Sequence, residues 1–161
     1  MGRSNLTAGL DVGSRSLELV VLEGGRLKYW EIRPTTFDPL AQIRRLLARV
    51  KVEKLVATGY GRRLVAEALP ERTLAVITEI QAYALGARFL FPETRTVLDI
   101  GGQDTKAIVL TPEGKVAKFE MNDRCAAGTG KFLEFMALAL QVPLEEFGAF
   151  ALKADRRLPI N

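Results

Sequence analysis

The chain contains one pattern twice, and this internal repeat is the feature that most limits how it can fold. The first copy starts at Gly9 and reads GLDVGSRSLELVVLEGGRLKYWEI; the second starts at Val97 and reads VLDIGGQDTKAIVLTPEGKVAKFEM. In each copy an apolar segment ends at an aspartate, a glycine follows two residues later, and a glycine-containing turn joins two further strand-like segments. The copies align with a single one-residue insertion. The repeat therefore predicts two related lobes, each opening with three consecutive strands.

The segment between the two copies alternates helical and strand patterns. We predict helices from Asp38 to about Val50, from Gly59 to Leu69 and from Glu79 to about Phe91, because capping residues, helical apolar spacing or a terminating proline mark them. Short strands are predicted over Lys54–Thr58 and Leu74–Ile77. Strands that alternate with helices give an α/β fold.

The repeat also predicts the domain organisation. We expect an N-terminal lobe over residues 1–94 with the first aspartate turn, and a second lobe over residues 95–161 with the second turn. Two copies imply two lobes that face each other across a cleft. After its three strands the second lobe has a helix from about Gly128 to Leu140 and a short helix after Pro143, with no strand after them. We therefore expect the second lobe to be incomplete.

The composition argues against several classes of function. The chain is 48% hydrophobic and 26% charged, as in globular proteins, and its net charge of +4 comes from basic residues scattered among acidic ones. No aromatic residues interleave with a basic run, so we expect no nucleic-acid binding. No apolar run approaches the roughly 20 residues of a membrane span, and the N-terminus lacks the apolar core of a secretory signal. We expect a cytoplasmic protein without membrane contact, and its one cysteine excludes an intrachain disulfide framework.

Each aspartate turn has the chemistry of a phosphate-binding loop. Glycine lets the backbone approach a phosphate and present its N–H groups. An aspartate beside phosphates needs an intervening cation, and Mg²⁺ held through water is the natural one. One Asp-x-Gly alone is more often a tight hairpin, whereas two in matching repeats favour a nucleotide held by both turns. The predicted ligands are Asp11, Gly13 and Ser14 in the first turn, with Asp11 holding Mg²⁺ through water, and Gly101 and Gly102 in the second.

The second turn also carries the candidate catalytic residues. Asp99 ends its strand, and Gln103 or Asp104 could orient a water molecule towards the terminal phosphate. Ordinary turn polarity is the alternative interpretation of these two residues. The glycine-rich segment further on is not a Walker loop, because Lys131 is followed by Phe132 where Ser or Thr is required.

The single cysteine, Cys125, precedes the helix predicted from about Gly128. A helix N-terminus favours a thiolate, so a metal-ligand or reactive role is one interpretation. A small buried hydrophobic residue is the other.

Taken together, these segments resemble the activators of 2-hydroxyacyl-CoA dehydratases and the related ATPase subunits of benzoyl-CoA reductases. The resemblance implies the actin/hexokinase/Hsp70-like (ribonuclease H-like) ATPase fold. The segments that carry it are LDVGS at Leu10–Ser14, ATGYGR at Ala57–Arg62, ITEI at Ile77–Ile80, LDIGGQDTKAI at Leu98–Ile108 and MNDRCAAGTGKFLE at Met121–Glu134.

The resemblance implies a homodimeric ATPase that binds ATP or ADP with Mg²⁺ and bridges one [4Fe–4S] cluster. Such activators couple ATP hydrolysis to delivery of a low-potential electron to a partner, a 2-hydroxyacyl-CoA dehydratase or a benzoyl-CoA reductase-like iron–sulfur protein. Cys125 matches a cluster ligand, in agreement with thiolate ligation of iron. Asp11 and Gly13 match the first phosphate loop of the family, and Asp99, Gly101, Gly102 and Gln103 match the second.

The chain departs from the family in three respects. The second cluster cysteine and the adenosine-binding segment of the family belong beyond Asn161, and Gln81-Ala82 stands where the family usually has a Cys-His pair. We therefore expect the N-terminal portion of an activator, without a complete cluster in this chain alone. The alternative is a non-catalytic truncated paralogue that acts as an interaction or regulatory module.

Overall fold

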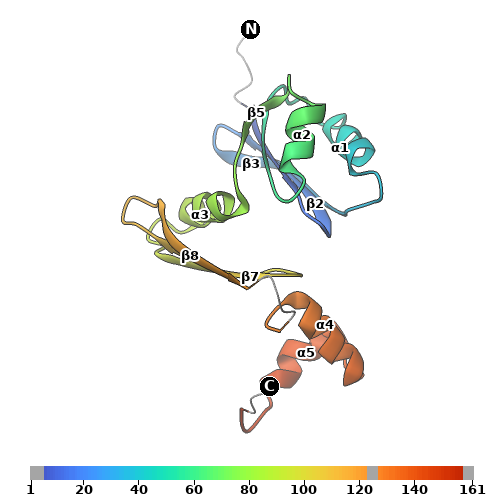
Figure 1. Ribbon diagram of the computed structural model, residues 1–161, viewed down its shortest axis with the longest axis vertical. Helices are drawn as coiled ribbons and strands as arrows, with labels where there is room; N and C mark the ends of the chain where they lie inside the picture. The colour runs from blue at the N-terminus through green and yellow to red at the C-terminus, as the bar shows by residue number, and fades with distance from the viewer. Residues whose placement is uncertain (1–5, 123–126, 158–161) are drawn as a thin grey trace. The chain divides into compact units, whose positions relative to one another are not determined.

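The computed structural model describes residues 6–122 and 127–157 (Figure 1). The chain divides into two compact units. Unit 1 is Met1–Pro92 and unit 2 is Glu93–Asn161. Each unit combines a β-sheet with helices, so the predicted α/β class is confirmed. No helix in the described ranges has both the length and the hydropathy that a membrane crossing requires.

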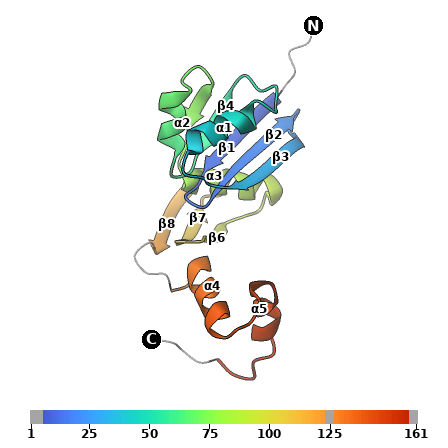
Figure 2. The same ribbon diagram turned by 90° about the vertical axis from the view of Figure 1, so that its right-hand side faces the viewer.

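Unit 1 is built on a five-stranded sheet with the order β3-β2-β1-β4-β5. β1 pairs antiparallel with β2 and parallel with β4. A parallel pair needs a crossover connection, which here contains α1. The helices α1 and α2 lie on the same face of the sheet (Figures 1 and 2). In chain order the elements are β1 (Leu6–Val12), β2 (Ser16–Glu23), β3 (Arg26–Pro34), α1 (Pro39–Leu47), β4 (Leu55–Thr58), α2 (Arg62–Ala68), β5 (Thr73–Val76) and α3 (Glu79–Leu90).

The core of unit 1 lies between this sheet and the helices α1 and α2. Side chains alternate along a strand, and Leu10 of β1 lies opposite Leu19 of β2, both fully buried. Ile43 and Leu47 of α1 and Val65 of α2 belong to the same cluster. Burying a side chain of this size contributes roughly 1.5–3 kcal/mol. This cluster therefore holds β1, and the turn that follows it, in place.

Two helices of unit 1, α1 and α3, begin at the residues that their capping signals predict. The third, α2, begins at Arg62 and not at Gly59, because Gly59 has a φ of +84° and is not helical. Asp38 Oδ1 accepts a hydrogen bond from Ala41 N at 2.9 Å at the start of α1. Thr78 and Gln81 form a capping box at the start of α3, each side chain bonding the other's backbone N–H. Both caps satisfy backbone donors that the first turn of a helix leaves without intrahelical partners.

Two further sequence-based expectations for these helices need correction. α1 ends at Leu47 and not at Val50, because the chain tightens after it: Arg49 N donates to Leu46 O at 3.1 Å, three residues back and not four. In α3 the spacing of Ile80, Tyr83, Ala84 and Ala87 predicts one inward-facing stripe. This stripe is only partly interior, because Ala84 is 2% exposed but Tyr83 is 37% exposed. A long phenolic side chain can pack its ring and still reach solvent with its polar end.

Unit 2 opens with a three-stranded antiparallel sheet in the order β6-β7-β8. Two helices follow, and the first begins at Gly130 with Thr129 at the N-cap position, two residues later than predicted. The elements are β6 (Thr96–Ile100), β7 (Thr105–Leu110), β8 (Val116–Asn122), α4 (Gly130–Ala139) and α5 (Leu144–Ala151).

The strand registers confirm the internal repeat. Asp11 lies opposite Glu18 in unit 1, and Asp99 lies opposite Lys106 in unit 2, which are equivalent positions in the alignment of the two copies. The second strand of each copy also has a register break against the third strand, and the breaks fall at aligned residues. They lie between Val21 and Leu22 in β2 and between Val109 and Leu110 in β7.

Candidate functional site

The first aspartate turn joins β1 to β2 and is closed by its own backbone. Gly13 N donates a hydrogen bond to Ser16 O at 2.9 Å. A Cβ at Gly13 would lie only 2.9 Å from that same oxygen, so the turn itself requires glycine. Thr35, just after β3, supports the turn from outside: its Oγ1 donates to Gly13 O at 2.8 Å and its N donates to Arg15 O at 2.8 Å. Ser14 is exposed at the tip.

A Gly-x-Gly loop between β4 and α2 packs directly against this turn. Gly59 has a φ of +84°, and a Cβ there would overlap Asp11 Oδ1 and lie 2.7 Å from Val12 O. Gly61 N donates to Val12 O at 2.8 Å, and a Cβ at Gly61 would overlap the Val12 side chain. Arg62 Nη1 donates to Gly59 O at 2.9 Å, which further fixes the loop. The Asp11 carboxylate thus packs against the backbone of Gly59, where any other residue type would place a Cβ atom in its way.

Thr58, the last residue of β4, lies beside Asp11 in the parallel register. Its side chain is buried, and Thr58 Oγ1 has no hydrogen-bond partner among the described residues. A buried hydroxyl without a partner costs about 1–3 kcal/mol. The carboxyl ends of parallel strands are where α/β sheets bind ligands, and Thr58 Oγ1 lies at such an end, beside Asp11.

The second aspartate turn joins β6 to β7 and has the same closure. Gly101 N donates to Asp104 O at 2.8 Å, and a Cβ at Gly101 would lie 2.7 Å from Asp104 Oδ1. The start of α4 is attached to this turn, because Gly130 N donates to Gly101 O at 2.8 Å and Lys131 N donates to Gly102 O at 2.9 Å. A Gly-x-Gly loop therefore backs the turn in each unit.

A buried lysine joins the two acidic residues of the second turn. Lys106 Nζ lies 3.3 Å from Asp99 Oδ2 and 2.5 Å from Asp104 Oδ1. The lysine side chain is 4% exposed, whereas those of Asp99 and Asp104 are 16% and 28% exposed. The predicted catalytic residues Asp99 and Asp104 are thus brought together by one ammonium group, while Gln103 lies exposed in the turn.

The two turns share a shape but differ in charge. In unit 1 the position that corresponds to Lys106 is Glu18, whose Oε1 accepts a hydrogen bond from Ser16 Oγ at 3.0 Å. In unit 2 the residue that corresponds to Ser16 is Asp104, which binds the lysine. The same framework therefore presents an acidic pair in the first turn and two carboxylates bridged by a cation in the second.

Sequence reasoning missed three residues that shape these turns. The signal for Lys106 was present, because it alternates with Ile108 on the inward face of β7, where a charge needs a partner. Thr35 and Thr58 gave no signal, since an isolated threonine at a strand end is compatible with ordinary packing.

The cysteine prediction lies outside the structural description, because Cys125 falls within residues 123–126. Among residues 6–122 and 127–157, no group of three or more Cys, His, Asp or Glu side chains is arranged to hold a metal ion. The loop after residue 126 is connected to the sheet: Thr105 Oγ1 donates to Gly128 O at 2.6 Å, and Asn122 Nδ2 donates to Ala127 O at 3.1 Å.

Comparison with known proteins finds similar proteins among the activators of 2-hydroxyacyl-CoA dehydratases. The 2-hydroxyisocaproyl-CoA dehydratase activator of Clostridioides difficile is 37% identical over 164 residues, which cover 96% of this chain and 60% of the activator. A solved structure of the activator of 2-hydroxyisocaproyl-CoA dehydratase from Clostridium difficile, with bound ADPNP, has a TM-score of 0.79 at 34% identity, covering 95% of this chain and 59% of that one. The structure of (R)-2-hydroxyglutaryl-CoA dehydratase component A from Acidaminococcus fermentans has a TM-score of 0.81 at 35% identity, covering 96% of this chain and 61% of that one.

A more distant neighbour shares the fold alone. The ROK hexokinase from Thermus thermophilus has a TM-score of 0.55 at 18% identity, covering 93% of this chain and 70% of that one. These likenesses confirm the predicted actin/hexokinase-type fold. The chain spans about 60% of the length of the curated activators that it matches. Residues 8–161 match the BadF/BadG/BcrA/BcrD ATPase family, and the chain belongs to this family.

Proposed function

We propose that the two aspartate turns bind phosphate groups of ATP or ADP together with Mg²⁺. The observation that carries the proposal is the repetition of one closed turn in two units, each backed by a Gly-x-Gly loop. A single such turn would be explained by its own hydrogen bonding. Two equivalent turns, in a family of ATPases with an ADPNP-bound relative, are better explained by phosphate binding at each turn.

We assign the water-mediated Mg²⁺ contact to Asp11 in preference to Asp99. Asp99 is already paired with the ammonium group of Lys106, whereas the equivalent position in unit 1 is Glu18, a second carboxylate. Mg²⁺ prefers oxygen ligands and keeps much of its water shell beside phosphates. A water molecule held by Thr58 next to Asp11 would suit that shell. Asp104 and Gln103 remain the candidates for orienting the attacking water.

The wider activity proposed for this family member is that of a dehydratase or reductase activator. The matched relatives include activators of 2-hydroxyacyl-CoA dehydratases and a benzoyl-CoA reductase component from Thauera aromatica. We propose that nucleotide hydrolysis at the turns drives electron delivery to such an iron–sulfur partner. A [4Fe–4S] cluster bound through Cys125 in a homodimer is part of this proposal and rests on the resemblance of the segment Met121–Glu134 to the family.

Calorimetric titration of the chain with MgADP and MgATP tests the nucleotide proposal. We expect Asp11→Asn to weaken binding by roughly tenfold or more, since a contact to a charged group contributes about 1.5–3 kcal/mol. Asp99→Asn should weaken binding as well, because it breaks the Lys106 bridge that fixes the second turn. Chelation of Mg²⁺ should weaken binding to wild type far more than to Asp11→Asn. Glu53→Ala, at an exposed acidic residue of unit 1, is the matched control and should leave binding unchanged. Equal affinity in wild type and both turn variants would reject the proposal.

A further inference from the structure

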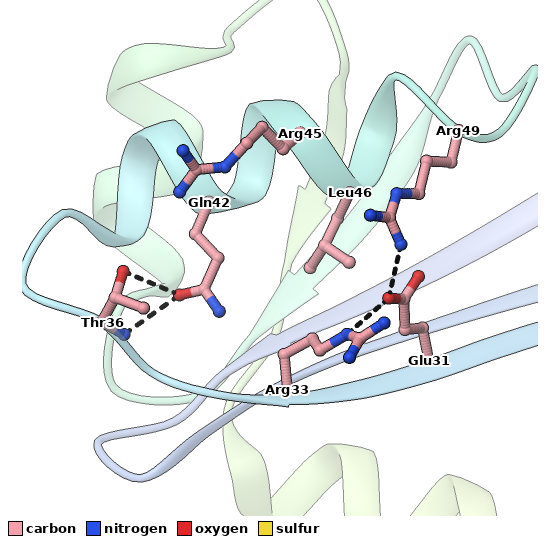
Figure 3. Close-up of a pocket in the computed structure, with 7 residues that line it drawn as sticks. All are labelled: Glu31, Arg33, Thr36, Gln42, Arg45, Leu46 and Arg49. Carbon is pink, nitrogen blue, oxygen red and sulfur yellow. Dashed lines mark hydrogen bonds and ion pairs between the residues drawn. The ribbon is translucent and has the colours of Figure 1, made fainter.

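A second, separate site lies on the edge of unit 1, between β3 and α1 (Figure 3). It is a pocket of about 180 Å³. Pockets for drug-sized ligands are typically 300–1,000 Å³, so this one has room for a small ion and not for a nucleotide. Its lining residues are Glu31, Arg33, Thr36, Gln42, Arg45, Leu46 and Arg49.

One carboxylate organises the charged part of this pocket. Glu31 Oε1 accepts hydrogen bonds from Arg33 Nε at 2.6 Å and from Arg49 Nη1 at 2.8 Å (Figure 3). Glu31 Oε2 accepts a hydrogen bond from the hydroxyl of Tyr29. The hydrogen bond from Tyr29, and then that from Arg33, hold the pKa of Glu31 below its usual value. Two guanidinium groups, one from the sheet and one from just beyond α1, are therefore fixed on the same acidic residue.

The polar wall of the pocket is also held in place. Gln42 is buried at 8% exposure, and its Nε2 donates to Pro34 O at 2.8 Å. Its Oε1 accepts hydrogen bonds from Thr36 N at 3.1 Å and from Thr36 Oγ1 at 3.2 Å. The loop between β3 and α1 is thus tied to the helix before any ligand arrives, which lowers the ordering cost of binding.

The charge of the lining favours an anion. Three arginines and one glutamate line the pocket, so its lining side chains carry a net charge of two positive. Arg33 and Arg49 point at Glu31, whereas the guanidinium of Arg45 points away from it (Figure 3). If the network only connected β3 to the end of α1, Glu31, Arg33 and Arg49 would be sufficient. Arg45 lines the same pocket but makes no hydrogen bond or ion pair within the described residues. Each guanidinium has five N–H donors in a planar fork that matches oxyanions, and Glu31 uses only one from each of Arg33 and Arg49.

We propose that this pocket binds a small dianionic oxyanion of the size of phosphate, held by Arg33 and Arg49 together with Arg45, whose exposed side chain turns toward them on binding. The volume of the pocket suits a small anion, and its net charge matches a dianion. The site does not depend on the proposed nucleotide function, because it shares no lining residue with either aspartate turn.

The test is a titration of the 161-residue chain with inorganic phosphate and with sulfate, followed by NMR of the arginine side-chain N–H groups. Chelator removes Mg²⁺, and the ionic strength is held constant with chloride, because salt alone screens exposed charges. We expect saturable shifts of the Arg45 and Arg49 resonances. Arg45→Gln should weaken binding at least about tenfold, since it removes a charged hydrogen-bond donor, and it should leave folding intact because Arg45 lies outside the Glu31 network.

The control variant is Arg44→Gln, at a neighbouring exposed arginine of α1 that does not line the pocket. It should bind phosphate as wild type does. The proposal is overturned if chloride produces the same shifts, if Arg44→Gln loses as much affinity as Arg45→Gln, or if no saturable shift occurs. Saturable shifts of the Gly13 and Ser14 backbone amides without shifts of the Arg45 and Arg49 side chains would place the anion at the first turn and would equally overturn it.

Discussion

The contact between the Gly59 loop and Asp11 gives a stability experiment whose size can be worked out from the structure. Gly59 has a φ of +84°, a conformation that costs a residue with a Cβ about 1–2 kcal/mol. The new methyl group would also overlap Asp11 Oδ1 and lie 2.7 Å from Val12 O. Overpacking of this kind costs about 1–3 kcal/mol. Gly59→Ala should therefore lower the free energy of unfolding by about 2–5 kcal/mol.

Three other glycines of unit 1 separate the two causes. Gly25 has a φ of +81°, and a methyl group there would meet nothing within 4 Å, so Gly25→Ala measures backbone strain alone, about 1–2 kcal/mol. Gly61 has a φ of −84° but a crowded methyl position, so Gly61→Ala measures overlap alone, about 1–3 kcal/mol. Gly9 has neither problem, and Gly9→Ala should change stability by less than about 0.5 kcal/mol.

The assay is equilibrium unfolding in urea, followed by the fluorescence of Trp30. This is the only tryptophan of the chain and lies in β3, so it reports on unit 1. The expected order of destabilisation is Gly59, then Gly61 and Gly25, then Gly9. A Gly59→Ala variant that loses no more stability than Gly25→Ala would refute the seating of Asp11 against the loop. Nucleotide affinity should fall only in Gly59→Ala and Gly61→Ala, because only these new methyl groups overlap the first aspartate turn.

Three further predictions concern polar side chains. Lys106→Met leaves two carboxylates without their shared cation and should lower the free energy of unfolding by about 2–4 kcal/mol. This is below the range for fully buried pairs because both acids are partly exposed. A loss under about 1 kcal/mol in urea unfolding would contradict the pairing. Thr58→Val removes a buried hydroxyl that lacks a partner among the described residues, so unfolding free energy should stay equal or rise by up to about 1 kcal/mol, and a clear loss would show that the hydroxyl is bonded in the protein. Hydrogen bonds from Tyr29 and Arg33 lower the pKa of Glu31, so the ionised carboxylate stabilises the fold. That contribution is lost as pH falls through the lowered pKa. Melting temperatures at about pH 6 and about pH 3 should therefore differ less in Glu31→Gln than in wild type.

The strands and turns could be predicted from the sequence because the repeat supplied two independent examples of the same unit. Apolar segments that end at an aspartate predicted the first strand of each copy, and the aligned glycines predicted the turns. Helix starts were equally accessible, since Asp38 and Thr78 are strong capping residues. The end of α1 was misplaced by three residues because Val50 continues the apolar spacing after the chain has already left the helix at Leu47.

The candidate site was only partly accessible to the same reasoning. Asp-x-Gly identified both turns, because that motif is local. The partners of the aspartates are not local: Gly59 and Thr58 come from β4 and the loop after it, and pairing of β1 with β4 cannot be inferred from the residues near Asp11. Lys106 is harder to predict, because the inward positions of a strand are usually apolar and a lysine there is buried only through its partners.

The charge difference between the two turns indicates that the two copies of the repeat have different roles. A lysine ammonium 3.3 Å from a carboxylate gains about 5 kcal/mol of Coulomb energy at an effective dielectric constant of about 20, before desolvation is counted. Mg²⁺ would have to displace that interaction to bind Asp99 closely. At the equivalent place in unit 1, Glu18 adds negative charge beside Asp11 and so raises the attraction for a divalent cation. The first turn is therefore the better cation-binding partner. The second turn, whose acidic residues are fixed by Lys106, is better suited to hold a polar group in one orientation.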